Sequence, residues 1–527
     1  MRRHAQKLLL ALLLASAGGC SVGPDYEKPT APVATKFKEQ AGWKASDPKD
    51  EIDRGRWWSI YRDPVLDALE KRVAIDNQSL KSAEAAYRQS RAIVDQARAS
   101  FFPTISASGS VQRSYTGAGA SRSGTSSVSI PTTGTGGTTT TVISGGLGSQ
   151  SFNQFSASLG ASWDIDIWGK IRRTVESDVA TAQASAADLA SARLSAQTTL
   201  AADYFQLRYQ EELKRLLDAT ATAYRESLRI AQNQYNAGVA AKADVLTAQT
   251  QLLNAQSAAI NAGVLRATLE HAIAVQVGQP AGDFAVDAGP LPRSVPVAPV
   301  GLPSTLLERR PDIAAAERRM AAANAQIGVA IAAYFPDLTL SGTYGSEATK
   351  IGRLFSAPTT FWSLGADVAE SVLDFGARSA QVEQARGLFE QNVANYRQTV
   401  LTGFQQVEDE LATLRILEEQ AKVQDDVVKS AQEAERLTLN QYKAGTVPYS
   451  SVVTAQATSL SAQQTAIGLT QNRLTASVTL IQAIGGGWDA TKLPRVDQVE
   501  DNTSFLKVVP IATDHPTSSD EPPADKK

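Results

Sequence analysis

The sequence predicts an α+β fold that is mainly helical, in which each chain contributes four β-strands and two long helical hairpins. Three observations support this fold class. Trp168–Ala237 contains no proline and only one glycine, Gly169. Segments of alternating apolar and polar residues precede this stretch, and the whole arrangement occurs twice along the chain. A helix of that length would measure about 105 Å, several times the diameter of a compact domain.

The proline-free stretch is expected to pack along a second helix. Near its end, apolar residues recur every three or four positions, as in the seam of paired helices: Leu217, Ala221, Tyr224, Leu228, Ala231 and Tyr235. The stretch stops at Gly238, and a second proline-free segment, Lys242–Val277, follows. Glycine is typical just after a helix, so we expect a helical hairpin with a free tip.

The helical hairpin is repeated 207 positions later. Asn233–Gly238 reappears as Asn440–Gly445, and the same offset carries Trp168 onto Phe375. Neither copy of the long helix has therefore gained or lost a residue. A repeat of this length indicates a duplicated subdomain rather than a solenoid unit.

Alternating residues predict a β-hairpin before each long helix. In the first copy, apolar or small residues alternate with Ser, Thr or Asp over 105–111 and 155–167. The second copy repeats the pattern over 338–344 and 362–368. Four strands leave two unpaired edges and one uncovered apolar face, so they cannot form a stable sheet alone.

Two arrangements could cover that apolar face. If it faces lipid while the polar face meets water, several chains close a membrane β-barrel, which needs at least about eight strands. Alternatively, the strands are the edge of a soluble β-sandwich packed on the helices. Aromatic residues near the strand ends favour the bilayer, because such residues concentrate at membrane interfaces: Phe152, Trp163, Trp168, Phe361 and Trp362.

The N-terminus predicts export and lipid attachment. A basic start, the apolar run Leu8–Ala15 and the small residues Ser16–Gly19 indicate a signal peptide over residues 1–19. Cleavage would leave Cys20, the only cysteine, as the first residue, which resembles a bacterial lipobox. We expect acylation of Cys20, including palmitate, because stable anchoring needs two or more acyl chains. The alternative is an ordinary signal peptide followed by an incidental cysteine. By resemblance to such lipoproteins, Ser21 favours the outer membrane.

Five segments follow from these signals. The signal peptide, 1–19, precedes a lipid-anchored extended segment, 20–62, which is rich in Pro, Lys and Asp. The first repeat covers 63–285 and opens with a helix from Asp63-Pro64 through Ala99, with Leu66, Leu69 and Val73 on one face. The second repeat covers 286–490. The tail, 491–527, has the composition of a disordered segment.

The order of several short motifs resembles the outer-membrane efflux lipoproteins of the TolC and NodT type. These motifs are the lipobox with Cys20–Tyr26, Trp57-Trp58, Asp63-Pro64, Arg309–Ile313, Ala316-Glu317, Ile327-Gly328, Phe335-Pro336 and the two Gln-Tyr-x-Ala-Gly hairpins. The resemblance extends from Cys20 to Trp488. It implies a homotrimer with one twelve-stranded outer-membrane β-barrel, continued by a periplasmic α-helical barrel. It also implies docking onto a periplasmic membrane-fusion adaptor and an inner-membrane pump.

The resemblance further implies that the hairpin tips close the periplasmic mouth and meet the adaptor. The matching positions are Tyr235, Gly238, Asp244, Tyr442, Gly445, Ser451 and Thr454. Ser451 and Thr454 stand where many relatives have carboxylates that form a cation-attracting ring, so a ring here would be weaker or formed by Asp244 alone. Alternatively, Asp244 only stabilises the N-terminus of its helix, by about 0.3 to 1 kcal/mol. Tyr235 and Tyr442 could likewise serve only in seam packing.

Composition and missing motifs exclude several functions. The 527 residues carry a net charge of −3, without the basic character of nucleic-acid-binding proteins. One cysteine and three histidines argue against a disulfide or a metal site. No nucleotide-binding motif, redox centre or activated nucleophile indicates an enzyme or a cofactor, apart from the expected lipid. Together with the resemblance to efflux lipoproteins, which implies an outer-membrane exit duct for small toxic compounds, these absences lead us to expect a passive duct without an energy source of its own. A duct for type I protein secretion and a coiled-coil scaffold without a channel are the alternatives.

Overall fold

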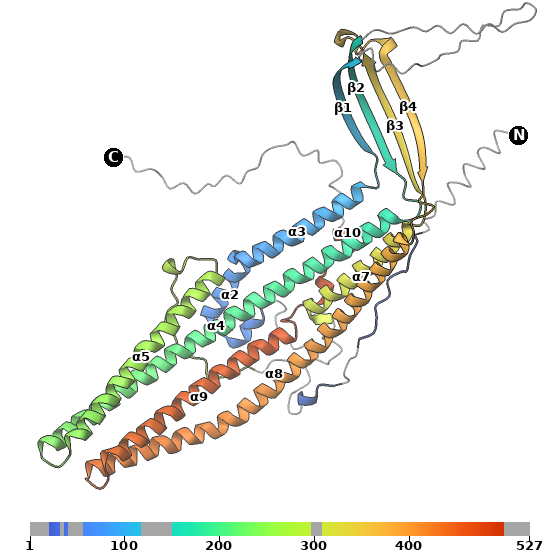
Figure 1. Ribbon diagram of the computed structural model, residues 1–527. Helices are drawn as coiled ribbons and strands as arrows, with labels where there is room; N and C mark the ends of the chain where they lie inside the picture. Colours follow the sequence, from blue (N-terminus) through green and yellow to red (C-terminus); the bar gives the residue numbers. More distant parts are fainter. Residues whose placement is uncertain (1–20, 32–35, 41–55, 117–149, 297–307, 500–527) are drawn as a thin grey trace, which may run out of the picture. The chain divides into compact units, whose positions relative to one another are not determined.

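The computed structural model describes residues 21–31, 36–40, 56–116, 150–296 and 308–499 (Figure 1). The predicted signal peptide, Cys20 and residues 500–527 lie outside these ranges. The chain divides into two compact units. Of the described residues, the sheet unit comprises 21–24, 96–116, 150–175 and 327–383, and the helical unit comprises 25–31, 36–40, 56–95, 176–296, 308–326 and 384–499.

The sheet unit contains one antiparallel sheet with the strand order β1-β2-β3-β4. The strands are β1 (Thr104–Thr116), β2 (Gln150–Asp164), β3 (Asp337–Ala348) and β4 (Thr360–Ala369). β1 and β4 are the outer strands of this sheet (Figure 1). The two β-hairpins predicted from alternation are therefore confirmed, and β2 and β3 join them into one sheet.

The two faces of the sheet differ as the alternation predicts. Side chains on the polar face bond across strands, for example Ser108 Oγ to Ser158 Oγ at 2.8 Å and Thr339 Oγ1 to Asp164 Oδ1 at 2.7 Å. The opposite face carries large apolar side chains that are well exposed, including Ile105 and Leu364. Among the described residues of the sheet unit, no other element covers this apolar face.

The two predicted helical hairpins form the core of the helical unit. The first consists of α4 (Lys170–Asn236) and α5 (Lys242–Gln276), and the second of α8 (Ala377–Lys443) and α9 (Tyr449–Ala483). The long helices α4 and α8 each have 67 residues, and α5 and α9 each have 35. The repeat is thus kept residue for residue. Both hairpin turns lie at the same end of the helical unit (Figure 1).

The helix predicted from Asp63 through Ala99 is in fact two helices, α2 (Pro64–Asp76) and α3 (Gln78–Ala99). Asn77 separates them in an extended conformation. Its Nδ2 donates to the carbonyl of Gln276 at 2.8 Å, and its Oδ1 accepts from the amide of Leu80 at 3.0 Å. The side chain thereby caps α3 and fixes the break against α5. The predicted apolar face of α2 is confirmed by buried Leu66, Leu69 and Val73.

The main core of the helical unit joins the N-terminal elements to the long helices. Trp57, Tyr204, Leu411 and Leu474 are among its fully buried side chains. Helix α7 (Pro311–Ala332) packs against α8 in a separate cluster. The remaining elements are α10 (Val496–Val499) and the 3-10 turns Lys38–Gln40, Trp57–Tyr61, Ala281–Asp283, Ile351–Arg353, Ala357–Thr359 and Ala490–Lys492. Over the described ranges, no helix combines the length and the apolar character that crossing a bilayer requires.

Candidate functional site

The two hairpin tips turn in the same way. Gly238 and Gly445 follow α4 and α8 with φ angles of 76° and 74°, a left-handed conformation that glycine adopts without strain. The amide of Val239 donates to the carbonyl of Gln234 at 2.9 Å, and the amide of Thr446 donates to that of Gln441 at 3.0 Å. Each turn thus closes the preceding helix with the hydrogen bond that a left-handed glycine allows. Both predicted tip glycines lie at the turns.

The tips of the two hairpins pack against each other through a small buried cluster. Tyr442 and Tyr449 lie at its centre, with their ring centroids 5.2 Å apart. Apolar side chains from both hairpins surround them: Ala231, Val245, Ala248 and Val452. Gln234 adds a polar link, because its Nε2 donates to the carbonyl of Tyr442 at 3.3 Å. The cluster therefore joins the hairpins near their tips.

Within one copy of the chain, Tyr442 packs against the other hairpin as the seam predicts, whereas Tyr235 lies outside this cluster, so seam packing of Tyr235 stays a prediction. Tyr235 is 41% exposed, whereas Tyr442, at the equivalent position of the second repeat, is 4% exposed. The two hairpins lie side by side, so equivalent faces of α4 and α8 cannot both face the neighbouring hairpin. Tyr442 lies on the face of α8 that contacts the first hairpin, whereas Tyr235 lies on a face of α4 that points away from this cluster.

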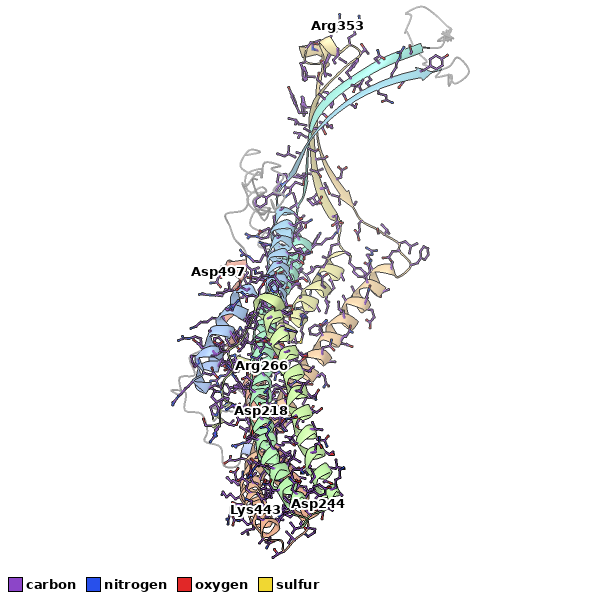
Figure 2. All side chains as sticks on the ribbon, turned by 90° about the vertical axis from the view of Figure 1, so that its left-hand side faces the viewer. Asp218, Asp244, Arg266, Arg353, Lys443 and Asp497 are labelled. Atoms are coloured by element: carbon purple, nitrogen blue, oxygen red, sulfur yellow. The ribbon has the colours of Figure 1, made fainter. Side chains whose placement is uncertain are left out.

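Asp244 lies in the first turn of α5, half-buried beside the tyrosine cluster. Burial raises the pKa of Tyr442, and the Asp244 carboxylate raises it further. Burial raises the pKa of Tyr449 to about 12, with smaller contributions from the charges of Tyr442, Tyr224 and Asp244. Both phenols therefore stay neutral at physiological pH, and Asp244 places its charge close to the contact between the hairpins. Figure 2 shows Asp244 and Lys443 at this same end of the helical unit.

Ser451 and Thr454 lie in the first turns of α9 and carry no charge. The Thr454 hydroxyl donates to the carbonyl of Ser450 in its own helix at 3.1 Å. The second hairpin thus has no carboxylate at these two positions that could form a ring together with Asp244. A carboxylate ring formed by Asp244 alone stays a prediction, as does its role at the helix end.

A second polar link between the hairpins lies farther from the tips. Nε2 of Gln456 in α9 donates to Oγ of Ser227 in α4 at 3.0 Å. Each of these residues is 2% exposed. The sequence marks this position only through the repeat, because Thr247-Ala248-Gln249 reappears as Thr454-Ala455-Gln456 and so aligns Gln456 with Gln249. Local sequence could not show that Gln456 is buried while Gln249 is exposed.

The N-terminal segment is bound to the helical unit by specific contacts that sequence reasoning missed. The Tyr26 hydroxyl donates to Glu317 at 3.0 Å. Farther along, the Glu408 carboxylate accepts from the amides of Lys38 and Glu39 at 2.6 and 3.0 Å. Arg415 pairs with the Glu39 carboxylate at 2.8 Å. The segment is thus fixed on α7 and α8 at separate points.

Three consecutive carboxylates in α8, Glu408, Asp409 and Glu410, have the sequence pattern of a solvated helix face, but only part of this run is solvated. Glu408 binds the backbone of the N-terminal segment. Glu410 is half-buried, and its pKa is raised by burial and by the neighbouring charge of Asp409. Only Asp409 of the three is exposed as the sequence suggested.

The predicted membrane-interface aromatics have different surroundings. Trp163 lies on the apolar face, and its Nε1 donates to the carbonyl of Phe101 at 2.9 Å. Trp168 stacks on Phe335 with a centroid separation of 4.7 Å. Trp362 is 72% exposed on the apolar face. The side chain of Phe152 lies outside those that the structure describes.

Phe361 requires a correction. It pairs with Gly345, and by alternation it shares the polar face with Ser363 and Asp367 rather than the apolar face with Trp362. Adjacent strand residues point to opposite faces, so the two neighbouring aromatics cannot both face lipid. Among the described residues, no group of three or more His, Cys, Asp and Glu side chains is arranged to hold a metal ion.

Comparisons with known proteins agree with this architecture. A profile of the outer membrane efflux protein family matches residues 71–279 and 302–486. The antibiotic efflux pump outer membrane protein ArpC of Pseudomonas putida is 30% identical over 491 residues, covering 91% of this chain and 95% of ArpC. The pyoverdine export outer membrane protein OpmQ of Pseudomonas aeruginosa is 30% identical over 491 residues, covering 92% of this chain and 97% of OpmQ.

The fold also matches solved channels. The outer-membrane channel OprN superposes with a TM-score of 0.78 at 27% identity, over 89% of this chain and 100% of OprN. The predicted fold class and the outer-membrane localisation, with the helices extending into the periplasm, are thereby confirmed. The family profile spans most of both repeats, so this chain belongs to the family of outer membrane efflux proteins.

Proposed function

We propose that three copies of this chain form a passive exit channel of a tripartite efflux system. The observation that carries the proposal is the four-stranded antiparallel sheet, which exposes an apolar face and continues in sequence into two long helical hairpins. Within the described residues, β1 and β4 each have one unpaired edge. Pairing of β1 with β4 of the next copy would keep the antiparallel order and close a barrel of twelve strands, above the minimum of about eight.

The channel supplies the path, and an energised partner supplies the driving force. The family consists of efflux channels rather than enzymes. We assign the driving force to an inner-membrane pump, and the connection to a periplasmic adaptor that meets the hairpin tips. ArpC is named for antibiotics and OpmQ for pyoverdine. Because both cargoes are small molecules, we favour small toxic compounds over secreted proteins as the cargo of this chain.

The tip contacts provide a gate. The Tyr442–Tyr449 cluster holds the two hairpins together, and the Gln456–Ser227 hydrogen bond crosses between them farther from the tips. An adaptor would open the mouth by binding more tightly to the state in which these contacts are separated, since a ligand shifts an equilibrium only through its differential affinity. Asp244 would then set the preference for cations at the mouth.

The start of the described chain supports a lipid anchor on Cys20. Ser21 lies against Gly169, just beyond the end of β2, and the amide of Val22 donates to the carbonyl of Trp168 at 3.1 Å. Arg173 donates to the carbonyls of Val22 and Gly23. The residue after the anchor is thus held beside the end of the sheet, where acyl chains on Cys20 could enter the bilayer.

Accumulation of varied compounds in a deletion strain tests this function. We expect small toxic compounds to accumulate in the deletion strain and to fall to the normal level when the gene is restored. Loss of export of a secreted protein, with normal tolerance of small compounds, would select the type I secretion alternative. Unchanged accumulation and secretion in both strains would contradict an exit channel.

A further inference from the structure

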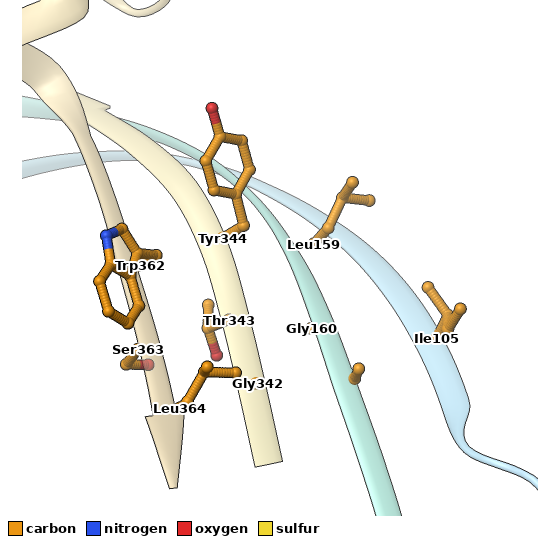
Figure 3. Close-up of a pocket in the computed structure, with 10 residues that line it drawn as sticks. Ile105, Leu159, Gly160, Gly342, Thr343, Tyr344, Trp362, Ser363 and Leu364 are labelled. Carbon is orange, nitrogen blue, oxygen red and sulfur yellow. The ribbon is translucent and has the colours of Figure 1, made fainter.

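The apolar face of the sheet contains a hollow with a volume of about 380 Å³ (Figure 3). Ala161 of β2 and Gly342 of β3 form its floor, and they pair directly across the two central strands. Ile105 of β1 and Leu364 of β4 flank this pair in the same row of the sheet. Two small residues between two large ones make the depression.

The next row of the sheet forms one end of the hollow. Leu159, Tyr344 and Trp362 lie side by side there, and Figure 3 shows their side chains standing above the strands. No charged residue lines the hollow. Its volume falls within the range of about 300 to 1,000 Å³ that is common for small-molecule sites, and its lining suits hydrocarbon.

The place of the hollow in the sheet indicates what fills it. Neighbouring copies would pair at the edges β1 and β4, so they would leave the floor on β2 and β3 uncovered. In an outer-membrane protein, an uncovered apolar strand face meets acyl chains. An acyl chain lying over Ala161 and Gly342 would also cover the inner sides of Ile105 and Leu364. The two small floor residues are too short to cover them.

The depth of the hollow identifies the leaflet. The end of β2 at Asp164 leads into α4, so this end is the periplasmic one. Trp163, a predicted membrane-interface residue on the apolar face, marks the edge of the apolar band at this end. Ala161 and Leu159 lie two and four residues from it, about 7 and 14 Å along the strand. With a strand tilt of about 35 to 45°, the hollow lies about 5 to 11 Å into an apolar band of about 25 Å, in its periplasmic half.

We propose that this hollow is a binding site for one acyl chain of a phospholipid from the periplasmic leaflet of the outer membrane. The floor accepts the chain because it lacks large side chains, and Trp362 and Tyr344 cover the part nearest the bilayer centre. This site rests on the proposed barrel of three copies but not on the cargo of the channel, so a failure of the efflux assay alone would leave it standing.

Tryptophan quenching tests the site. The assembled protein, purified in detergent, is titrated with a phosphatidylethanolamine whose acyl chains carry bromine near their middle. The Trp362 contribution is the part of the quenching that Trp362→Phe removes. We expect this contribution to saturate at low lipid content. Ala161→Phe fills the floor and should abolish the saturable part.

Ala366→Phe is the matched control, because Ala366 is also an exposed alanine on the apolar face but does not line the hollow. It should keep the saturable quenching. Gly342→Val fills the same floor from β3 and should repeat the effect of Ala161→Phe if that variant fails to assemble. Equal quenching in Ala161→Phe and Ala366→Phe would overturn the proposal.

Native mass spectrometry of protein extracted from membranes supplies a second readout. We expect a phospholipid to be retained on the wild type and on Ala366→Phe, and to be lost from Ala161→Phe. Retention of lipopolysaccharide instead of phospholipid would assign the hollow to the other leaflet and overturn the proposal. Retention of detergent alone would also overturn it.

Discussion

The Gln456–Ser227 contact yields the sharpest prediction about the gate. Gln456 donates one hydrogen bond to Ser227, but Oε1 of Gln456 is buried without a partner among the described residues. Such a hydrogen bond contributes about 0.5 to 1.5 kcal/mol, whereas an unsatisfied buried oxygen costs about 1 to 3 kcal/mol. Opening would return both groups to water. The glutamine therefore weakens the closed contact overall.

Two substitutions at this position should act in opposite directions. Gln456→Met keeps the shape and removes both polar groups, and Ser227 still donates to the carbonyl of Ala223. It should favour the closed state by about 1 kcal/mol, roughly a fivefold change in the ratio of closed to open channels. Gln456→Ala instead leaves a cavity and should favour opening by about 1 to 3 kcal/mol.

The assay is the fraction of time that single channels stay open in planar bilayers. Gln249→Met and Gln249→Ala are matched controls, since Gln249 occupies the equivalent position in the first repeat but is exposed. We expect these two variants to match the wild type. A shift of Gln456→Met and Gln456→Ala in the same direction would refute the reasoning.

Three further predictions concern single residues in the helical unit. Gly238→Ala should destabilise the protein by about 1 kcal/mol, because its φ is 76°, whereas Gly263→Ala inside α5 should stabilise it by about 0.5 to 1 kcal/mol. At both positions the added Cβ would have no other atom within 4 Å, so the two substitutions differ only in the backbone conformation that alanine must adopt. Thermal midpoints that shift in the same direction in both variants would contradict this explanation. Burial raises the pKa of Glu70 well above its usual value, so the folded state keeps its proton at pH values where the unfolded state loses it. Stability is then lost as the pH rises from the unfolded pKa toward the folded one, and Glu70→Gln should raise the thermal midpoint more at pH 8 than at pH 4. An equal gain at both pH values would show that the carboxyl does not titrate in this way. Asp244→Asn should reduce cation preference, measured as the reversal potential across a salt gradient, and an unchanged potential would leave Asp244 only its role at the helix end.

The long helices and the strands could be predicted because their signals are local. The absence of proline between Gly169 and Gly238 marks α4, and the residue-for-residue repeat gives α8. Alternation marks all four strands and their two faces. These features depend on backbone geometry, which neighbouring residues determine.

The features that escaped prediction depend on distant contacts. Asn77 ends α2 because its side chain bonds the carbonyl of Gln276 in another helix. Tyr235 and Tyr442 have nearly the same local sequence, but only one faces the other hairpin. Glu408 lies in a charged helical segment, and its backbone partners belong to the N-terminal segment. In each case the partner is set by the tertiary fold and leaves no local pattern.

Phe361 shows a different limit. An aromatic residue at a strand end predicts the membrane interface, but the register places Phe361 on the polar face and Trp362 on the apolar one. Alternation alone could have separated these two neighbours, because adjacent residues in a strand point to opposite faces.

The most direct test of the account is a structure, determined by electron cryomicroscopy, of the protein reconstituted in lipid nanodiscs. We predict three copies with β1 of each paired to β4 of the next, in one closed sheet around a continuous bore. A single copy in the bilayer, or three copies whose β1 and β4 edges stay unpaired, would contradict it.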